Sequence, residues 1–113
     1  IGVETFVVDD GWFTGRVDDR HGLGDWDVDP AKFPDGLDTF IAQLGELGLD
    51  FGLWVEPESV SPGSALATEH PDWILRTEGR EPLQFRNQFG LEHVFDQVGI
   101  AVDVARCHIG VAY

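Results

Sequence analysis

The sequence is poor in the residues that mark several common classes of protein. Its single cysteine, Cys107, excludes an internal disulfide bond, and methionine is absent from all 113 residues. Only 7 lysine and arginine residues stand against 21 aspartate and glutamate residues, so the formal net charge is −14. Because so acidic a chain should repel nucleic acids and anionic membranes, we expect neither as a partner.

Other absences narrow the chemistry and the location of the protein. The four histidines lack the spacing of metal ligands, and there is no glycine-rich phosphate loop and no Gly-x-Ser-x-Gly nucleophile motif. No apolar run is long enough to span a bilayer, and no signal peptide opens the chain, which together with the lone cysteine predicts a cytoplasmic protein. The start at Ile1, without methionine, suggests a piece of something larger.

Two hydrophobic runs on either side of a helical pattern predict a β-α-β unit. Residues 5–8 are β-branched or aromatic without alternation, which is typical of a strand buried on both faces in a parallel sheet. Residues 37–47 carry an apolar stripe at helical spacing, with Asp35 or Gly36 to cap its start and Gly48 placed for a left-handed residue at its end. Residues 49–55 then return to a strand. The pattern predicts an α/β fold with parallel strands.

A long polar segment, residues 9–36, separates the first strand from the helix. It is too rich in glycine, aspartate and proline to be helical. Its four aromatic residues argue against disorder, and loops of this length are usually functional. These residues are Trp12, Phe13, Trp26 and Phe33.

The second part of the chain has weaker patterns. Residues 64–69 predict a short helix that ends at His70-Pro71. Residues 73–75 and 83–85 are typical of two strands, so we expect a hairpin with its turn at Glu78-Gly79. Residues 92–98 could be helical, and residues 100–104 could adopt either state.

Carboxylates follow both predicted parallel strands, at the edge where α/β proteins bind their ligands. Asp9 and Asp10 follow the first strand, and Glu56 and Glu58 follow the second. Paired carboxylates accept hydrogen bonds from sugar hydroxyls, bind cations or serve as acid and base. An Asp-Gly turn explains the first pair equally well, so the residue types alone leave both interpretations open.

Three further features have a functional and a plain interpretation. Trp54 ends the second strand, where an indole can line a site and donate an N–H, and we place Glu56 rather than Glu58 in that site. Arg86 offers a planar fork to carboxylates or hydroxyls, although its spacing alone favours a surface ion pair. Residues 25–36 resemble a calcium loop but have Pro30 and Gly36 where glycine and glutamate are needed, so we expect an acidic loop with Trp26 folded inward.

Several blocks, in the same order along the chain, resemble the family 36 α-galactosidases. They cover roughly residues 4–89 and include "FVVDDGWF", "LGDW", "FPDGLDTFIAQLGELGLDFGLWVEPESVSPGSALATEHPDWIL" and "RNQ". The resemblance implies a (β/α)₈ barrel that removes terminal α-linked galactose with retention of configuration. It also implies a galactoside oligosaccharide as substrate and no metal or organic cofactor. Raffinose synthases and related galactosyltransferases are the nearest alternative group.

The resemblance also implies roles for four residues. Those matching Asp9 and Asp10 hydrogen-bond galactose hydroxyls, the one matching Trp54 lines the same pocket, and the one matching Arg86 reaches the sugar near the nucleophile. We therefore expect these four as substrate-binding residues.

The chain departs from the family in what it lacks. The nucleophile of the family lies in a Lys-Trp-Asp motif that is absent here, so we assign no catalytic residue. Residues 90–113 diverge from the family pattern, which leaves the third strand in doubt, although "HIGVAY" resembles the approach to the nucleophile strand. We interpret residues 1–113 as a partial catalytic barrel domain, with two βα units, a hairpin and an irregular tail. A non-catalytic remnant is the alternative, and the oligomeric state of the parent protein stays open.

Overall fold

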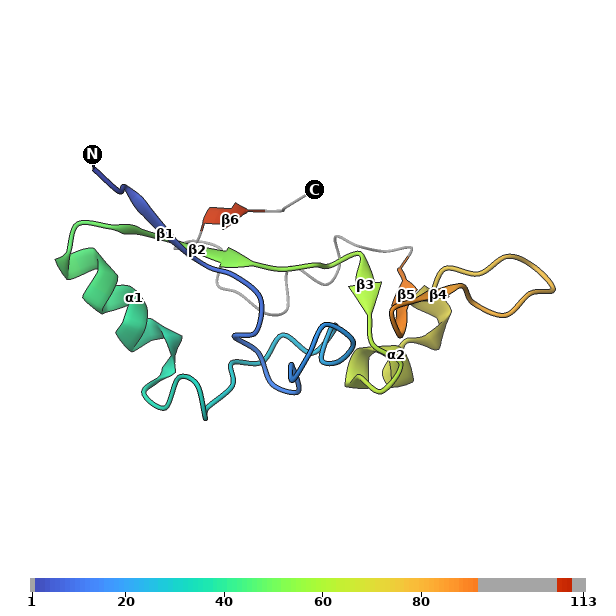
Figure 1. Cartoon of the computed structure of the whole chain (residues 1–113). Coiled ribbons are helices and arrows are strands. Elements are labelled where there is room, and N and C mark those ends of the chain that lie inside the picture. The colour runs from blue at the N-terminus through green and yellow to red at the C-terminus, as the bar shows by residue number, and fades with distance from the viewer. Residues whose placement is uncertain (1, 92–107, 111–113) are drawn as a thin grey trace.

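The computed structural model describes residues 2–91 and 108–110, which form two small sheets joined by loops and helices (Figure 1). The first sheet is parallel, with the strand order β1-β2-β6. Its strands are β1 (Thr5–Val8), β2 (Asp50–Trp54) and β6 (His108–Gly110). The predicted parallel pair is confirmed, and the third position beside β2 is taken by a strand from the divergent tail. The regions expected at residues 92–98 and 100–104 lie outside the described residues.

Helix α1 (Gly36–Glu46) connects β1 to β2 as the apolar stripe predicts. Phe40 contacts Phe6 of β1 and Phe51 of β2, with ring centroids 5.8 Å and 6.3 Å apart. Gly48 has φ +74°, which is the left-handed conformation expected after the helix. Asp35 occupies the N-cap position, but its side chain makes no capping hydrogen bond. The helix therefore follows from its hydrophobic face more than from its cap.

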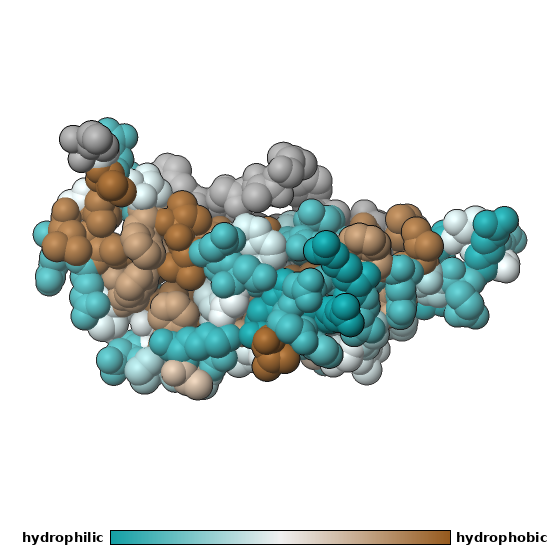
Figure 2. All heavy atoms as spheres, viewed as in Figure 1, coloured by the Kyte–Doolittle hydropathy of each residue, from teal (hydrophilic) through white to brown (hydrophobic). Residues whose placement is uncertain are grey.

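Strand β1 differs from its prediction in burial. Phe6 is 43% exposed and Val7 is 53% exposed, so the expected burial on both faces is wrong for this chain. The reason is that β1 pairs with β2 alone among the described residues, and α1 reaches one side of it. Figure 2 shows hydrophobic residues gathered over this end of the molecule.

The long segment between β1 and α1 folds inward and supplies much of the first core. Trp12, Phe13 and Trp26 are buried, and each ring contacts the other two at centroid distances of 4.7–6.1 Å. An isolated β-bridge between Phe13 and Val28 closes the segment on itself. The expected inward position of Trp26 is confirmed. The rest of this core is Leu23, Leu44, Phe51, Leu53 and Val55.

The second sheet is antiparallel, with the order β3-β5-β4. Its strands are β3 (Ser59–Val60), β4 (Gln84–Phe85) and β5 (Gln88–Gly90), and helix α2 (Ala65–Glu69) and the 3₁₀ helix η1 (Pro71–Trp73) lie beside it. The core of this part consists of Val60, Ala67, Ile74 and Leu91.

The predicted hairpin between residues 73–75 and 83–85 is wrong. Pro71 starts the 3₁₀ helix that contains Trp73, and Ile74 forms a single β-bridge with Leu91. The hairpin instead joins β4 to β5 across the two-residue turn Arg86-Asn87. The expected turn near Gly79 is present, since the Arg80 amide donates to the Thr77 carbonyl at 3.0 Å.

We call β1, residues 9–36, α1, β2 and β6 the aromatic half, and residues 59–91, which contain β3, α2, η1, β4 and β5, the hairpin half. Residues 23–25 join the halves. The Leu23 amide donates to Ser61 Oγ at 3.1 Å, and the Leu23 carbonyl accepts from the Ser61 amide at 2.9 Å. Asp25 accepts hydrogen bonds from the Ala65 and Leu66 amides at the start of α2. In the described residues, no helix is long and apolar enough to cross a membrane.

Candidate functional site

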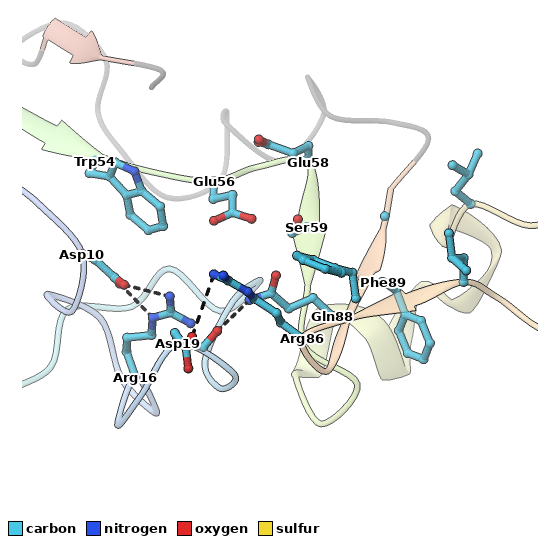
Figure 3. A pocket seen from close by; sticks show the side chains of 14 residues that line it. Asp10, Arg16, Asp19, Trp54, Glu56, Glu58, Ser59, Arg86, Gln88 and Phe89 are labelled. Atoms are coloured by element: carbon cyan, nitrogen blue, oxygen red, sulfur yellow. Dashed lines mark hydrogen bonds and ion pairs between the residues drawn. The ribbon is translucent and has the colours of Figure 1, made fainter. Parts of the chain in front are cut away.

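An open cleft of about 570 Å³ lies between the two halves, beside the end of β2, and its volume is within the usual range for small-molecule sites (Figure 3). The aromatic half lines it with polar groups and one indole, and the hairpin half adds polar and apolar side chains. The lining residues are Asp10, Arg16, Asp19, Trp54, Glu56, Glu58, Ser59, Leu75, Leu83, Phe85, Arg86, Gln88, Phe89 and Gly90.

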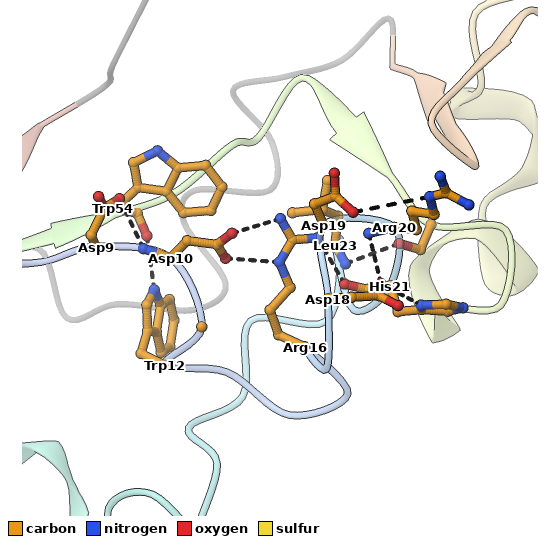
Figure 4. Close-up of polar contacts among 12 residues, drawn as sticks. Asp9, Asp10, Trp12, Arg16, Asp18, Asp19, Arg20, His21, Leu23 and Trp54 are labelled. Carbon is orange, nitrogen blue, oxygen red and sulfur yellow. Dashed lines mark hydrogen bonds and ion pairs between the residues drawn. The ribbon is translucent and has the colours of Figure 1, made fainter.

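Asp10 reaches the cleft from the turn that follows β1. Its two carboxylate oxygens accept hydrogen bonds from Nε and Nη2 of Arg16, each at 2.8 Å (Figure 4). The side chain of Asp10 is still 42% exposed, because Arg16 covers it from one side. Asp10 is therefore an ion-paired carboxylate that keeps acceptor capacity toward the cleft.

Arg16 is buried beneath that carboxylate, with 6% of its side chain exposed. Its third nitrogen, Nη1, donates to the His21 carbonyl at 2.9 Å. The hydrogen bonds to Asp10 raise the pKa of Arg16 above its ordinary value, against the desolvation that lowers it, and the charges of Glu56 and Asp19 act in the same direction as Asp10. Arg16 is thus a permanent cation next to the acidic wall of the cleft.

Asp9 does not line the cleft with Asp10. Its Oδ1 accepts a hydrogen bond from the Asp10 amide at 2.8 Å, which is a local turn contact, and the residue is exposed. The two adjacent carboxylates point in different directions in Figure 4. Of the pair singled out from the sequence, the structure brings Asp10 to the cleft and leaves Asp9 outside its lining.

Trp54 is placed in the cleft by the end of β2 and is braced through its backbone. The Trp54 carbonyl accepts a hydrogen bond at 2.8 Å from Nε1 of Trp12, whose side chain is buried. Because Trp12 follows β1 and Trp54 ends β2, this bond ties the ends of the two parallel strands together. It fixes the positions of Asp10 and Trp54 relative to each other.

Arg86 enters the cleft from the hairpin half, at the turn between β4 and β5. Arg86 has φ +50° and Asn87 has φ +61°, and positive φ at both central residues is the mark of a type I′ turn. Such values are uncommon for residues other than glycine, so this turn holds Arg86 in a costly conformation. Its Nη1 lies 3.9 Å from Asp19 Oδ2, and its guanidinium lies 5.4 Å from the Phe85 ring centroid.

The turn is fastened to the opposite wall by its neighbours. Nδ2 of Asn87 donates to the Arg20 carbonyl at 3.3 Å, and Nε2 of Gln88 donates to the Asp19 carbonyl at 3.0 Å. These contacts explain how the polar triplet Arg86-Asn87-Gln88 is used: Arg86 and Gln88 line the cleft, and Asn87 and Gln88 attach the hairpin to residues 19–20.

Both acids after β2 line the cleft, which corrects the placement of Glu58. Glu56 is half-buried there, and Glu58 is exposed on the same wall. The chain turns at residues 57–58, where the Ser59 amide donates to the Glu56 carbonyl at 3.3 Å, and the two carboxylates share one cavity. Four carboxylates and two guanidinium groups therefore line the cleft, and it has an excess of negative charge.

In residues 25–36, which resemble a calcium loop, Asp25 and Asp29 bind protein groups instead. Asp25 accepts from the backbone of α2, and Asp29 accepts from the Ala31 amide and pairs with Lys32 at 3.2 Å. These contacts lower the pKa of Asp29, with the Ala31 amide as the main cause. Among the described residues, no group of three or more histidine, cysteine or acidic side chains could hold a metal ion.

Sequence reasoning missed Arg16 and Asp19, which line the cleft beside Asp10. Both lie in the segment that folds back on itself, so no strand or helix period places them. The available signal was a single arginine six positions after an Asp-Asp pair in a strongly acidic chain. The resulting site offers hydrogen-bond acceptors, guanidinium donors and one indole wall, which suit a neutral ligand with many hydroxyl groups.

Comparison with known proteins identifies close relatives of the chain. The Melibiase family model matches residues 1–106. Alpha-galactosidase AgaA of Geobacillus stearothermophilus is 52% identical over 98 residues, which are 87% of this chain and 13% of that protein. Alpha-galactosidase Mel36A of Lactobacillus acidophilus is 52% identical over 92 residues, or 81% of this chain and 13% of that protein. The chain thus spans about an eighth of the length of the curated relatives it matches.

Solved structures show the same similarity. A variant of AgaA in complex with stachyose superposes with a TM-score of 0.84 and 43% identity, covering 97% of this chain and 17% of that one. Another variant of AgaA, in complex with raffinose, gives a TM-score of 0.82 with 44% identity, covering 96% of this chain and 16% of that one.

Proposed function

The chain belongs to the melibiase family, and on this premise we propose that it forms part of the sugar pocket of an α-galactosidase, a retaining hydrolase that releases terminal α-linked galactose. The observation that carries the proposal is the convergence of Asp10, Trp54 and Arg86. These residues come from three distant segments and line one cleft beside the end of β2, at the ligand-binding edge of parallel sheets.

The proposed substrate is a galactoside oligosaccharide. The relatives AgaA and Mel36A are α-galactosidases by name, and variants of AgaA have been solved with raffinose and stachyose. In this chain, Asp10 and Asp9 accept hydrogen bonds from galactose hydroxyls, Trp54 forms an apolar wall and Arg86 donates to the sugar. The relatives do not favour a galactosyltransferase of the raffinose synthase type or a non-catalytic remnant.

We further propose that residues 1–113 are part of a (β/α)₈ barrel. The support is the parallel order β1-β2-β6 and the exposure of Phe6 and Val7 on β1, since strands of parallel sheets are normally covered on both faces. A full barrel takes about 250 residues, so other parts of the barrel would supply further strands. A retaining glycosidase needs two carboxyl groups about 5–5.5 Å apart across the bond, and we assign neither to this chain.

Activity of the full gene product that carries this sequence tests the proposal. We expect release of galactose from p-nitrophenyl α-galactoside and raffinose, and none from the matching β-galactoside. Product analysis with sucrose as acceptor should yield mainly free galactose, whereas transfer to sucrose would favour a galactosyltransferase. A folded wild-type protein that releases no galactose would refute the hydrolase.

A variant panel tests the residues. Asp9→Asn, Asp10→Asn and Arg86→Gln should each lower kcat/KM, by about 10- to 100-fold for the two residues in the cleft, because hydrogen bonds to charged groups contribute about 1.5–3 kcal/mol. Asp72→Asn and Arg80→Gln are the matched controls, since both residues are exposed and neither lines the cleft. Equal losses in the controls would contradict the site.

A further inference from the structure

Arg16 is the one charged residue that is buried among those the structure describes. Burying a charge is costly unless it is paired and hydrogen-bonded, so the partners of Arg16 decide what its charge does. Arg16 is among the residues that line the cleft, but only 6% of its side chain is exposed against 42% for Asp10, so a ligand would contact Asp10 far more than the guanidinium. Its effect on a ligand would pass through its neighbour.

The guanidinium is held on several sides. Nε and Nη2 each donate to a different oxygen of Asp10 at 2.8 Å, Nη1 donates to the His21 carbonyl at 2.9 Å, and the group lies 5.8 Å from the Phe13 ring centroid. A planar fork with two parallel bonds fixes the plane of the carboxylate as well as its distance. A lysine in the same place could act only as a point charge.

The backbone around this pair is also fixed. Nζ of Lys32 donates to the Gly11 carbonyl at 2.7 Å and to the Arg16 carbonyl at 3.2 Å, so one ammonium ties the two ends of the short segment that carries the ion pair. Added carbon at Gly22 would lie 2.7 Å from the Arg16 amide nitrogen, which shows how closely the next turn packs against it. Arg16 therefore has little freedom to follow a moving carboxylate.

The consequence falls on Asp10. An ionised carboxylate has about four acceptor sites, and Arg16 occupies one on each oxygen. The sites left over belong to a side chain that is 42% exposed and lines the cleft. Their direction is set by the guanidinium plane, so the geometry offered to a ligand depends on a residue whose own side chain is only 6% exposed.

We propose that Arg16 is the positioning residue of the sugar site: it holds Asp10 in the orientation in which its remaining oxygen lone pairs accept hydrogen bonds from galactose hydroxyls. The inference rests on the proposed function, because it takes Asp10 to be a sugar ligand. It adds that the orientation of Asp10, and not its charge alone, depends on the bidentate fork.

A double-mutant cycle in the full gene product tests this. Arg16→Lys keeps the charge and loses the fork, and Arg16→Met loses both. We expect each to lower kcat/KM for p-nitrophenyl α-galactoside by about tenfold or more, as for loss of a charge-assisted hydrogen bond. In an Asp10→Asn background the same changes should cost less than about twofold, because the interaction they disturb is already gone. Arg80→Met, at an exposed arginine that does not line the cleft, is the matched control.

The outcomes separate the two proposals. An active wild type whose Arg16 penalties are the same with Asp10 intact as in the Asp10→Asn background would overturn the positioning role and leave the α-galactosidase intact. Full activity of Arg16→Lys would do the same. If Arg16→Met does not fold, the activity of Arg16→Lys alone tests the positioning role. A wild type that neither hydrolyses galactosides nor binds galactose, followed by tryptophan fluorescence, would refute the function and the inference with it.

Discussion

The two halves of the molecule are stabilised in different ways. The aromatic half packs Trp12, Phe13 and Trp26 against one another, whereas the hairpin half has a core of Val60, Ala67, Ile74 and Leu91 and strands of two or three residues. Large aromatic side chains bury far more surface than valine or alanine. Asp10 and Trp54 therefore lie beside a large aromatic core, whereas Arg86 lies opposite them on a part with a smaller aliphatic core.

The largest effect is expected from breaking the aromatic half at Trp12. Trp12→Ala should lower the free energy of unfolding by about 3–5 kcal/mol, because it opens a cavity and removes the bond to the Trp54 carbonyl. Denaturant unfolding of the full gene product measures this. Val60→Ala, an equally buried site in the hairpin half, should cost less, about 2 kcal/mol, since it removes two methyl groups. Equal costs would contradict the contrast between the halves.

The next effect is expected where the halves join. Gly24 has φ +107°, and a Cβ there would lie 2.6 Å from Cγ2 of Val60. Gly24→Ala should cost about 3 kcal/mol through backbone strain and overpacking. Gly45→Ala is the control: Gly45 lies within α1 with nothing close to its added carbon, so that change should stabilise the protein by about 0.5–1 kcal/mol. Two shifts of the same sign in thermal melts would argue against a tight junction at Gly24.

A smaller effect is expected from the polar contact across the same junction. Asp25→Ala removes the acceptor for the Ala65 and Leu66 amides and should cost about 1 kcal/mol, as loss of a helix cap does. Asp27→Ala should be nearly neutral, because Asp27 is exposed and contributes its carbonyl, not its side chain, to the contacts with Thr14. The melting temperatures of the two variants can be compared directly. An unchanged melting temperature for Asp25→Ala would show that this contact does not stabilise the protein.

The smallest effect has the opposite sign and lies in the hairpin half. Arg86→Asn places a residue that tolerates positive φ at the first turn position, so it should stabilise the protein by about 0.5–1 kcal/mol. It should also lower kcat/KM if Arg86 binds the sugar. Melting curves and kinetics of one preparation test both, with Arg80→Asn as the control on an exposed loop. A stabilised variant with full activity would show that Arg86 does not bind the sugar.

The contrast between the halves also decides what could be predicted from the sequence. In the aromatic half, α1 follows from hydrophobic periodicity and β1 and β2 from short apolar runs on either side of it, and the ends of those strands draw attention to Asp10 and Trp54. In the hairpin half, strands of two or three residues are too short to show a period. Residues 73–75 have the composition of a strand, but Pro71 starts a 3₁₀ turn instead. The turn that carries Arg86 lacks the glycine by which such turns are usually recognised.

The candidate site was predictable in the same uneven way. Arg16 could not be assigned from spacing, because its position depends on how residues 10–22 fold back. The different directions of Asp9 and Asp10 depend on a hydrogen bond between neighbours. Both are properties of a loop backbone, for which local sequence patterns carry little information.

The turn at Arg86-Asn87 restricts how the length of this chain can vary. Because side chains alternate along a strand, one residue added there would shift the pairing of Gln84 and Phe85 and turn each to the other face. The exposed stretch at residues 76–81 has no such restriction, since doubling the length of a loop costs about 0.6 kcal/mol in closure entropy. Insertions and deletions that evolution accepts in this part of the molecule should therefore gather around Gly79 and spare the turn. The stability of a variant with one glycine inserted in the Arg86-Asn87 turn can be compared with that of a variant with one glycine inserted after Gly79.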